Sequence, residues 1–285
     1  MKFFFERISK LINTFEKKYY FMKTILVPLG NSEQAVNTLQ YAIDFASAVN
    51  ARIYVVQVFG SAKVTGLLRN IDEVIESRTK EEISTILSKV AVKNVDIKAI
   101  TSKGKILDVI SRASKELNID LIIASANITS ADSSLYLGTI TGGLVKQTEL
   151  PMLIIPMNYE FKPFNNGLIG VRSGIIRNPD VLKPLEDFIT NFNMKVNLLH
   201  VITPHNKEED NSLHQDFKTI SGSVTTSENA TVYHGVLEHL NSISPDLLCV
   251  IRRKRGFFAK LWEQNSIKKI DFESRIPLLV LKGNL

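Results

Sequence analysis

Cysteine is almost absent from this chain of 285 residues, since Cys249 is the only one. A single thiol cannot form an internal disulfide, and it cannot build a metal site from cysteines. We therefore expect a reducing compartment and predict a cytoplasmic location. Long apolar runs are also missing: none approaches the roughly 18 residues that a transmembrane helix requires, so no membrane span is predicted.

A strong excess of positive charge is missing from both large parts of the chain, although the net charge is +6. Residues 1–21 carry five Lys and Arg against two acids, residues 22–164 carry 15 against 14, and residues 165–285 carry 15 against 13. A nucleic-acid-binding domain typically shows a clear basic surplus. We therefore expect no nucleic-acid partner.

Signatures of catalysis are absent as well. The chain has no G-x-x-x-x-G-K-[ST], no G-x-S-x-G and no H-E-x-x-H. All five histidines lie at position 200 or later, and His200 falls in an apolar strand pattern, which favours a structural role. Cys249 also lies in an apolar run and is expected to be inert. With no metal-ligand set and no pairing of nucleophile and base, we predict a binding or signalling module that is not an enzyme.

What the chain does contain is an internal repeat. Lys23–Leu29 and Arg52–Val58 are β-branched apolar runs, and apolar residues recur between them at helical spacing. Gly167–Ser173 and Lys195–Val201 repeat this arrangement at an offset of 143 residues. A strand, a helix and a second strand form the crossover unit of a parallel sheet.

Later landmarks repeat at a shorter offset, 126 residues. Asp120–Ala124 resembles Asp246–Val250, and Leu150–Ile155 resembles Ile276–Leu281. The second copy has therefore lost 17 residues between its second and fourth strands. Residues 205–224, which stand in that place, are polar, acidic and weakly periodic, so we expect a trimmed helix or a partly mobile loop.

These patterns predict an α/β fold with two tandem domains, each an open five-stranded parallel sheet with helices on both faces. The expected boundaries are 1–21 for an N-terminal segment, 22–157 for the first domain, 158–166 for a linker and 167–285 for the second domain. Both domains end in an apolar strand that exposes a pairing edge. We expect the two edges to cover each other as an intramolecular pseudo-dimer, and a homodimer remains an alternative.

The N-terminal segment has apolar residues at helical spacing, among them Phe4, Ile8, Leu11 and Phe15, which indicates an amphipathic helix. Three interpretations stay open. The helix binds a membrane surface or a partner, or it packs on the protein's own surface. The third is that the segment is untranslated, because Met22 directly precedes a strong strand and is itself a candidate start.

The order of these features resembles a known family. ILVPLGNSEQAVNTLQYAIDFASAVNARIYVVQV resembles the opening of a universal stress protein domain, and LGTITGGLVKQTELPMLIIP resembles its close. IRRKRGFFAKLWEQNSIKKIDFESRIPLLVLKG resembles the end of a divergent second domain in tandem members. The resemblance implies five parallel strands per domain, dimerisation through the last strand, and a family with one branch that binds ATP and one that does not.

A nucleotide site would lie beyond the carboxyl ends of the strands, where the strand order reverses. ATP-binding relatives carry Gly-x2-Gly-x9-Gly-Ser/Thr, and the frame here is Ser125-x2-Ile128-x9-Gly138-Thr139. Its last pair is intact, but the first two glycines are lost, and Gly30 stands where relatives often carry an acid. The candidate binding residues are Pro28, Gly30, Asn31, Val58, Ala124, Ser125, Gly138, Thr139, Ile140 and Thr141.

Three functions remain open at this stage. The first is a stress-response module with a partly degenerate adenine-nucleotide site for ATP in the first domain. The second is an interaction or scaffold protein in which Gly138 and Thr139 only begin a helix. The third is a peripheral membrane protein held by residues 1–21.

The second domain carries Arg252-x2-Arg255-x9-Asn265-Ser266, without a glycine, and is not expected to bind ATP. Residues 252–262 form a basic and aromatic stretch that fits an anionic ligand or packing against the body.

Overall fold

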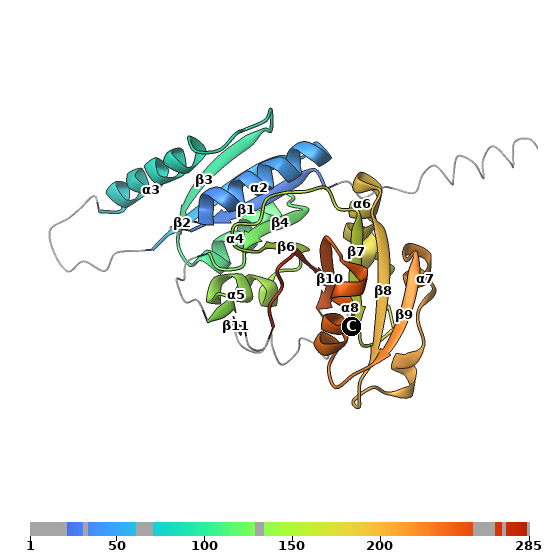
Figure 1. Cartoon of the computed structure of the whole chain (residues 1–285). Coiled ribbons are helices and arrows are strands. Elements are labelled where there is room, and N and C mark those ends of the chain that lie inside the picture. Colours follow the sequence, from blue (N-terminus) through green and yellow to red (C-terminus); the bar gives the residue numbers. More distant parts are fainter. Residues whose placement is uncertain are drawn as a thin grey trace, which may run out of the picture.

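The computed structural model describes residues 22–30, 34–60, 71–128, 134–252, 266–269 and 272–283 (Figure 1). The predicted amphipathic segment 1–21, the candidate site residue Asn31 and most of the basic and aromatic stretch, 253–262, lie outside these residues. What the sequence predicts for those segments stays a prediction. In the part of the chain that is described, no helix is both long and apolar enough to cross a bilayer.

The first half of the chain alternates strands and helices. Its elements are β1 (Thr24–Leu29), α2 (Gln34–Val49), β2 (Arg52–Phe59), α3 (Ile71–Leu87), β3 (Ile97–Lys103), α4 (Ile106–Glu116), β4 (Leu121–Ser125), β5 (Leu135–Leu137), α5 (Thr139–Gln147) and β6 (Met152–Ile155). The sheet order is β3-β2-β1-β4-β6, with all neighbours parallel. The order reverses direction at β1, which creates the switch point where open sheets bind ligands.

The second half repeats this order. Its elements are β7 (Asn166–Val171), η1 (Pro179–Leu182), α6 (Lys183–Phe192), β8 (Lys195–Ile202), η2 (Glu208–Asn211), α7 (Gln215–Ile220), β9 (Ser223–Glu228), α8 (Val232–Ile243), β10 (Leu247–Arg252), β11 (Ile267–Lys268) and β12 (Leu278–Lys282). The parallel order β9-β8-β7-β10-β12 matches that of the first half. The predicted fold class, five parallel strands with helices in each half, is confirmed.

The lost residues of the second copy do shorten a crossover. Where the first half has the 17-residue helix α3, the second has η2 and the six-residue helix α7. Phe217 of α7 is fully buried, and Ile220 at the end of this helix is partly buried against the same core. A short helix with one large buried ring covers less of the sheet than α3 does.

The repeated aspartates have the same structural task in both halves. The carboxylate Oδ2 of Asp120 accepts hydrogen bonds from the backbone N–H groups of Lys23 and Thr24, at 2.9 and 3.0 Å. Asp246 does the same for the N–H groups of Asn165 and Asn166, also at 2.9 and 3.0 Å. Each aspartate precedes an inner strand and satisfies the donors at the start of the neighbouring strand, which fixes the register.

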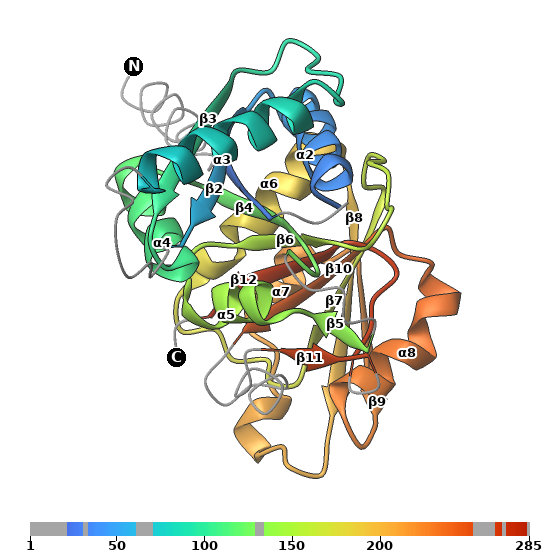
Figure 2. The same ribbon diagram turned by 90° about the vertical axis from the view of Figure 1, so that its left-hand side faces the viewer.

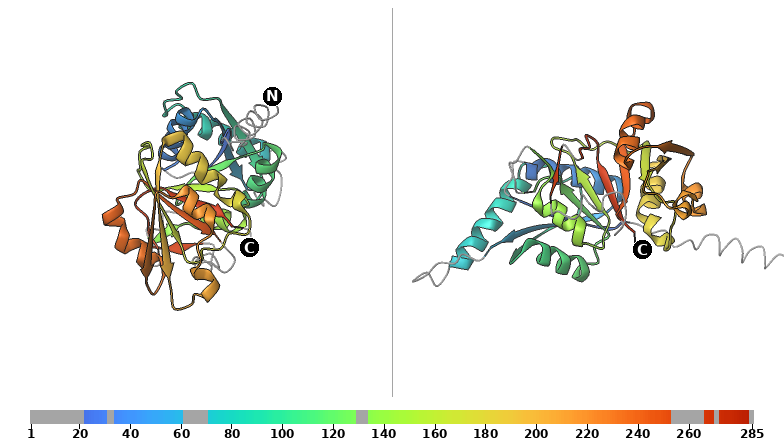
Figure 3. Two further views of the ribbon diagram at one scale, coloured as in Figure 1. Left: turned by 90° about the vertical axis from the view of Figure 1, so that its right-hand side faces the viewer. Right: turned by 90° about the horizontal axis from the view of Figure 1, so that it is seen from below.

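The two halves join through their last strands. β6 and β12 pair antiparallel, with Leu153 opposite Leu279, so that one ten-stranded sheet runs through the described chain (Figures 1 and 3). A second contact is the short antiparallel pair of β5 and β11, with Leu137 opposite Ile267. The sequence gives no sign of this pair, because strands of three and two residues are too short to show a period.

Helices cover both faces of the sheet, and each face has one core that spans both halves. Residues of α2, α3, α6 and α7 share one core, and residues of α4, α5 and α8 share the other. Figure 1 shows α2 and α3 on the opposite side of the first-half strands from α4 and α5. Because each core contains residues from both halves, the halves are held together by packing as well as by β6 and β12.

Aromatic side chains of the linker pack into the first of these cores. The ring of Phe164 lies 6.4 Å from that of Phe45 on α2, and 5.3 and 5.1 Å from those of Phe188 and Phe192 on α6. Phe45 and Phe188 themselves are 5.4 Å apart, so α2 and α6 meet directly (Figure 2). The segment between the domains is therefore part of the packing and not a free tether.

Replacing Phe164 tests this role. Its side chain is only 1% exposed, so Phe164→Ala should cost about 3–5 kcal/mol of unfolding free energy through the cavity it leaves. Because the ring touches helices of both halves, we expect one cooperative unfolding transition, shifted to lower denaturant. The matched control is Met157→Ala in the same connection, which is exposed and should change stability by no more than about 0.5 kcal/mol. Separate transitions for the two halves would contradict a shared core.

Candidate functional site

The predicted site residues lie where β1, β4 and the start of α5 converge. Pro28 ends up buried near the carboxyl end of β1, Ser125 ends β4, and Gly138 is the residue that caps the N-terminus of α5. Val58 lies near the carboxyl end of the next strand, β2, and is half-buried. The structure thus brings these candidates to one edge of the sheet, at the switch point beside β1.

Gly30 and Ile128 fill the space between the first and fourth strands. A Cβ atom on Gly30 would lie 2.7 Å from Cγ2 of Ile128 and closer still to its carbonyl oxygen, distances that real Cβ atoms do not show. Ile128 is 1% exposed and belongs to the apolar core under α4 and α5. Two of the three positions at which this chain departs from the ATP-binding pattern, Gly30 and Ile128, therefore lie in contact with each other.

Gly138 makes a similar close approach to Asn127. A Cβ atom on Gly138 would lie 3.0 Å from Cγ of Asn127 and closer to its Oδ1. The φ of Gly138 is −68°, which any residue can adopt, so the close packing and not the backbone conformation requires glycine here. The N–H of Gly138 donates to the carbonyl of Ala126 at 3.0 Å. That donor is therefore used within the protein.

The hydroxyl of Thr141 also forms a hydrogen bond within the protein. Its Oγ1 donates to the carbonyl oxygen of Ser125 at 2.9 Å, and both residues are buried. Ala124 is fully buried in β4. Thr139 is exposed and Ile140 is half-buried. Within Gly138–Thr141, Thr139 is thus the position that presents a hydroxyl-bearing side chain to solvent.

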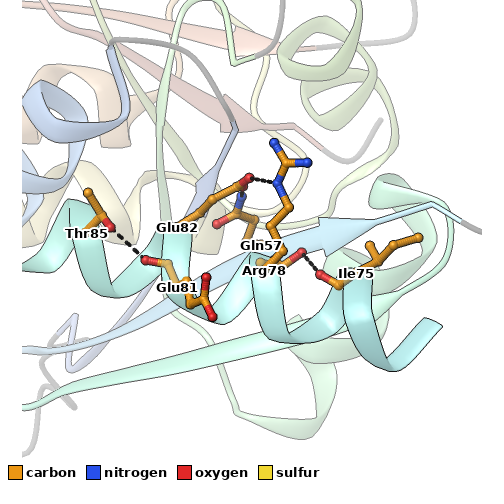
Figure 4. Close-up of polar contacts among 7 residues, drawn as sticks. Gln57, Ile75, Arg78, Glu81, Glu82 and Thr85 are labelled. Atoms are coloured by element: carbon orange, nitrogen blue, oxygen red, sulfur yellow. Dashed lines mark hydrogen bonds and ion pairs between the residues drawn. The ribbon is translucent and has the colours of Figure 1, made fainter. Parts of the chain in front are cut away.

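Polar side chains beside the site hold α3 on the sheet (Figure 4). Gln57, buried near the end of β2, donates from Nε2 to Oε2 of Glu82 at 2.9 Å. Glu82 in turn lies 3.3 Å from Nε of Arg78, through its other oxygen. The contact of Gln57 with Glu82 could not be predicted from the sequence, because one polar residue in an apolar strand does not indicate which residue it will bind.

The corresponding edge of the second half is closed by the segment after β8. A Cβ atom on Gly174 would lie 2.7 Å from Cα of Leu213. Asn206 donates from Nδ2 to the carbonyl of Arg172 at 3.0 Å, and His200 Nε2 lies 3.1 Å from the same carbonyl. His200 is buried, which agrees with the structural role expected for it.

Asp210 organises that segment, which the sequence presents only as polar and acidic. Its carboxylate accepts the N–H of Lys207 at 3.0 Å. Burial would raise the pKa of Asp210, but hydrogen bonds from Ser173 and Lys207 and the charge of Arg172 outweigh burial and lower it. A buried carboxylate with several donors explains why a stretch with weak periodicity takes up a defined path.

Arg252, the first residue of the basic and aromatic stretch, forms hydrogen bonds with the first half. Its guanidinium donates to the carbonyl of Lys146 through Nη1, and to that of Thr148 through Nη2 at 3.4 Å. Lys282 of β12 forms an ion pair with Glu149 in the same place. Cations at the C-terminus of α5 complement its free carbonyl groups and its dipole. The remainder of that stretch, 253–262, is outside the described residues.

The described residues offer few means of metal or thiol chemistry. They contain no group of three His, Cys, Asp or Glu side chains placed to hold a metal ion. Burial raises the pKa of the Cys249 thiol far above its usual range, which agrees with an inert core residue.

Comparison with known proteins agrees with this architecture. A universal stress protein from Archaeoglobus fulgidus DSM 4304 is 16% identical and superimposes with a TM-score of 0.67, over 93% of this chain and 98% of that one. A putative universal stress protein from Pseudomonas aeruginosa UCBPP-PA14 is 11% identical, with a TM-score of 0.60 over 92% and 94%. At these identities the likeness concerns the fold. No curated protein matches the sequence.

The sequence itself matches the universal stress protein family over residues 22–156. This range runs from the start of β1 to the end of β6, so it contains every described element of the first half. Residues 22–156 therefore belong to the universal stress protein family, and the likeness of the whole chain to solved structures is one of fold.

Proposed function

We propose that this protein acts in the stress response as a non-catalytic interaction module in the cytoplasm, and that the nucleotide site of its first half is closed by its own side chains. The observation that carries the proposal is the contact of Ile128 with Gly30. A nucleotide at the switch point needs room beside β1 and free backbone donors at the start of α5. Here Ile128 takes up room, and the N–H of Gly138 is bonded to Ala126.

The second half supports the same proposal. Its switch-point edge is covered by residues 203–214, which pack on Gly174 and are held by Asp210. Neither described edge presents the glycine cradle that brings backbone close to phosphate. A protein of this fold without an open ligand site can still offer its surfaces to partners, which is the role we assign to it.

Nucleotide binding in the first half is the second candidate. The observation in its favour is the intact pair Gly138 and Thr139 at the start of α5, where Thr139 remains exposed. A helix N-terminus attracts anions through its free N–H groups and dipole. For this candidate to hold, the segment with Asn127 and Ile128 has to move away from Gly30 and Gly138.

Thermal unfolding with millimolar ATP distinguishes the two candidates. A ligand that binds only the native state adds RT ln(1 + [L]/Kd), about 2.7 kcal/mol at a hundred times Kd. We expect no shift for the natural chain. Ile128→Gly removes the side chain that lies against Gly30, so it is the variant in which a response to ATP should appear if closure is what prevents binding. Ile128→Val is the control and should remain unresponsive.

A dose-dependent shift of the natural chain would favour nucleotide binding and contradict the proposal. Turnover of ATP by the natural chain would contradict its non-catalytic character. If Ile128→Gly gains no response while the natural chain has none, closure by that side chain alone is not the cause.

The packing at Gly138 can be tested without any ligand. Gly138→Ala places a Cβ against the side chain of Asn127 and should destabilise the protein by about 1–3 kcal/mol, as overpacking does. In an Asn127→Ala background the same change should cost far less, because the crowding atoms are gone. Urea unfolding of the four proteins measures this coupling. Equal costs in both backgrounds would show that Gly138 is required for another reason.

A further inference from the structure

The carboxylate of Asp187 is buried, and no cation among the described residues pairs with it. Asp187 lies on α6, is 3% exposed, and accepts one backbone hydrogen bond, from the N–H of Met22 at 2.8 Å. Among the described residues, no Lys, Arg or His forms an ion pair with it. A carboxylate in such a place normally has a cationic partner or several donors.

The counterpart of Asp187 in the first half has that partner. At the repeat offset of 143 residues the corresponding position is Asp44 on α2. Asp44 pairs with Nζ of Lys93 at 2.9 Å and also accepts a hydrogen bond from Gln40. Among the described residues the two equivalent aspartates therefore differ in their partners: Asp44 pairs with a lysine, whereas Asp187 faces a main-chain nitrogen.

Electrostatics around Asp187 make the lack of a cation costly. Burial raises its pKa to about 7, the N–H of Met22 lowers it, and the carboxylates of Asp120 and Glu186 raise it further. Those two acids, one preceding β4 and one on α6 itself, are the charged groups that act on it. A positive charge at the position of the Met22 nitrogen would relieve this repulsion and pair with the carboxylate.

The nitrogen that faces Asp187 belongs to a methionine, the residue that begins newly made chains. The side chain of Met22 is 1% exposed and packs in the core shared by α2 and α6. The strand β1 begins two residues after it, at Thr24. The composition also changes there, since residues 1–21 hold seven of the 23 aromatic residues and a charge of +3.

We propose that the protein has a form whose translation starts at Met22, and that the α-ammonium group of this form binds the carboxylate of Asp187. The nitrogen keeps its place, 2.8 Å from Oδ2. One of its hydrogens continues to point at the carboxylate, while loss of the preceding peptide leaves room for water at the others. The amino terminus of the first half would thereby be tied by an ion pair to a helix of the second half.

A cycle of four proteins tests the ion pair. The chains 1–285 and 22–285 are each made with Asp187 and with Asp187→Asn, which keeps an acceptor for the N–H but removes the charge. In 1–285 the raised pKa of Asp187 means that its contribution to stability is full below the unfolded value and is lost as the pH rises through about 7. Asp187→Asn should therefore raise the melting temperature of 1–285 at pH 8, and this gain should fade towards pH 4.

In 22–285 the sign should reverse at pH 7, because Asp187→Asn then removes one partner of a charge pair. We expect the melting temperature to fall by about 2–4 °C or more. The matched control is Glu186→Gln, the neighbouring exposed acid on α6, which removes a charge without touching Met22 and should not reverse sign between the two lengths. Acetylation of the Met22 amine, which keeps an N–H but abolishes the charge, should make 22–285 behave like 1–285.

The form itself is tested by intact-mass measurement on the protein isolated from its own cells, which should contain a species that begins at Met22 with a free amine. The inference is overturned if Asp187→Asn acts with the same sign in both lengths. It is equally overturned if 22–285 does not fold while 1–285 does, or if the cells contain only chains that begin upstream of Met22.

Discussion

The antiparallel pairing of β6 and β12 is the contact on which the rest of this structure depends. Each half ends in an apolar strand whose outer edge would otherwise expose unpaired backbone N–H and C=O groups together with apolar side chains. Pairing Leu153 with Leu279 removes both edges at once. It also places α2 beside α6, so that their phenylalanines and those of the linker form one aromatic cluster. The ion pair and hydrogen bonds of Lys282 and Arg252 at the end of α5 depend on the same pairing.

The two halves share one strand order and differ in what covers it. Both keep the strand order and the aspartate that satisfies the start of the inner strand. The first half covers its outer strands with α3, held partly by the polar contacts of Gln57 and Glu82. The second half replaces that helix with a shorter path organised around Asp210. These helices cover the outer strands, which lie far from the pair of β6 and β12, so the difference does not disturb the contact between the halves.

At the switch-point edge the chain departs from the ATP-binding pattern while the strand order stays the same in both halves. A site of this kind needs space and unpaired donors, and both are disadvantages when no ligand is present. Here Ile128 is buried and packs directly against the backbone of Gly30. The carbonyl groups of Ser125 and Ala126 take up the donors of Thr141 and Gly138. Two positions that depart from the ATP-binding pattern, Gly30 and Ile128, thus pack against each other.

The sequence by itself determined the fold class, the order of elements and the trimmed crossover. Periodicity reports which face of each element is buried, and the two offsets report the repeat, because both are properties local to the chain. The edge at which the site residues gather also followed, since parallel strands place their carboxyl ends together. The sequence showed that Asp120 and Asp246 occupy equivalent positions of the repeat, but it did not show their hydrogen bonds to the neighbouring strand.

Only the tertiary structure decided what those residues do. Ile128 lies against Gly30, Arg252 donates to the carbonyl of Lys146 at the end of α5, and Asp187 faces Met22; these contacts join positions 98, 106 and 165 residues apart. No periodicity encodes such pairs, because they arise when elements from both halves pack on a common sheet. The departures from the glycine pattern were therefore visible in the sequence, whereas the contact of Ile128 with Gly30 was a matter of packing.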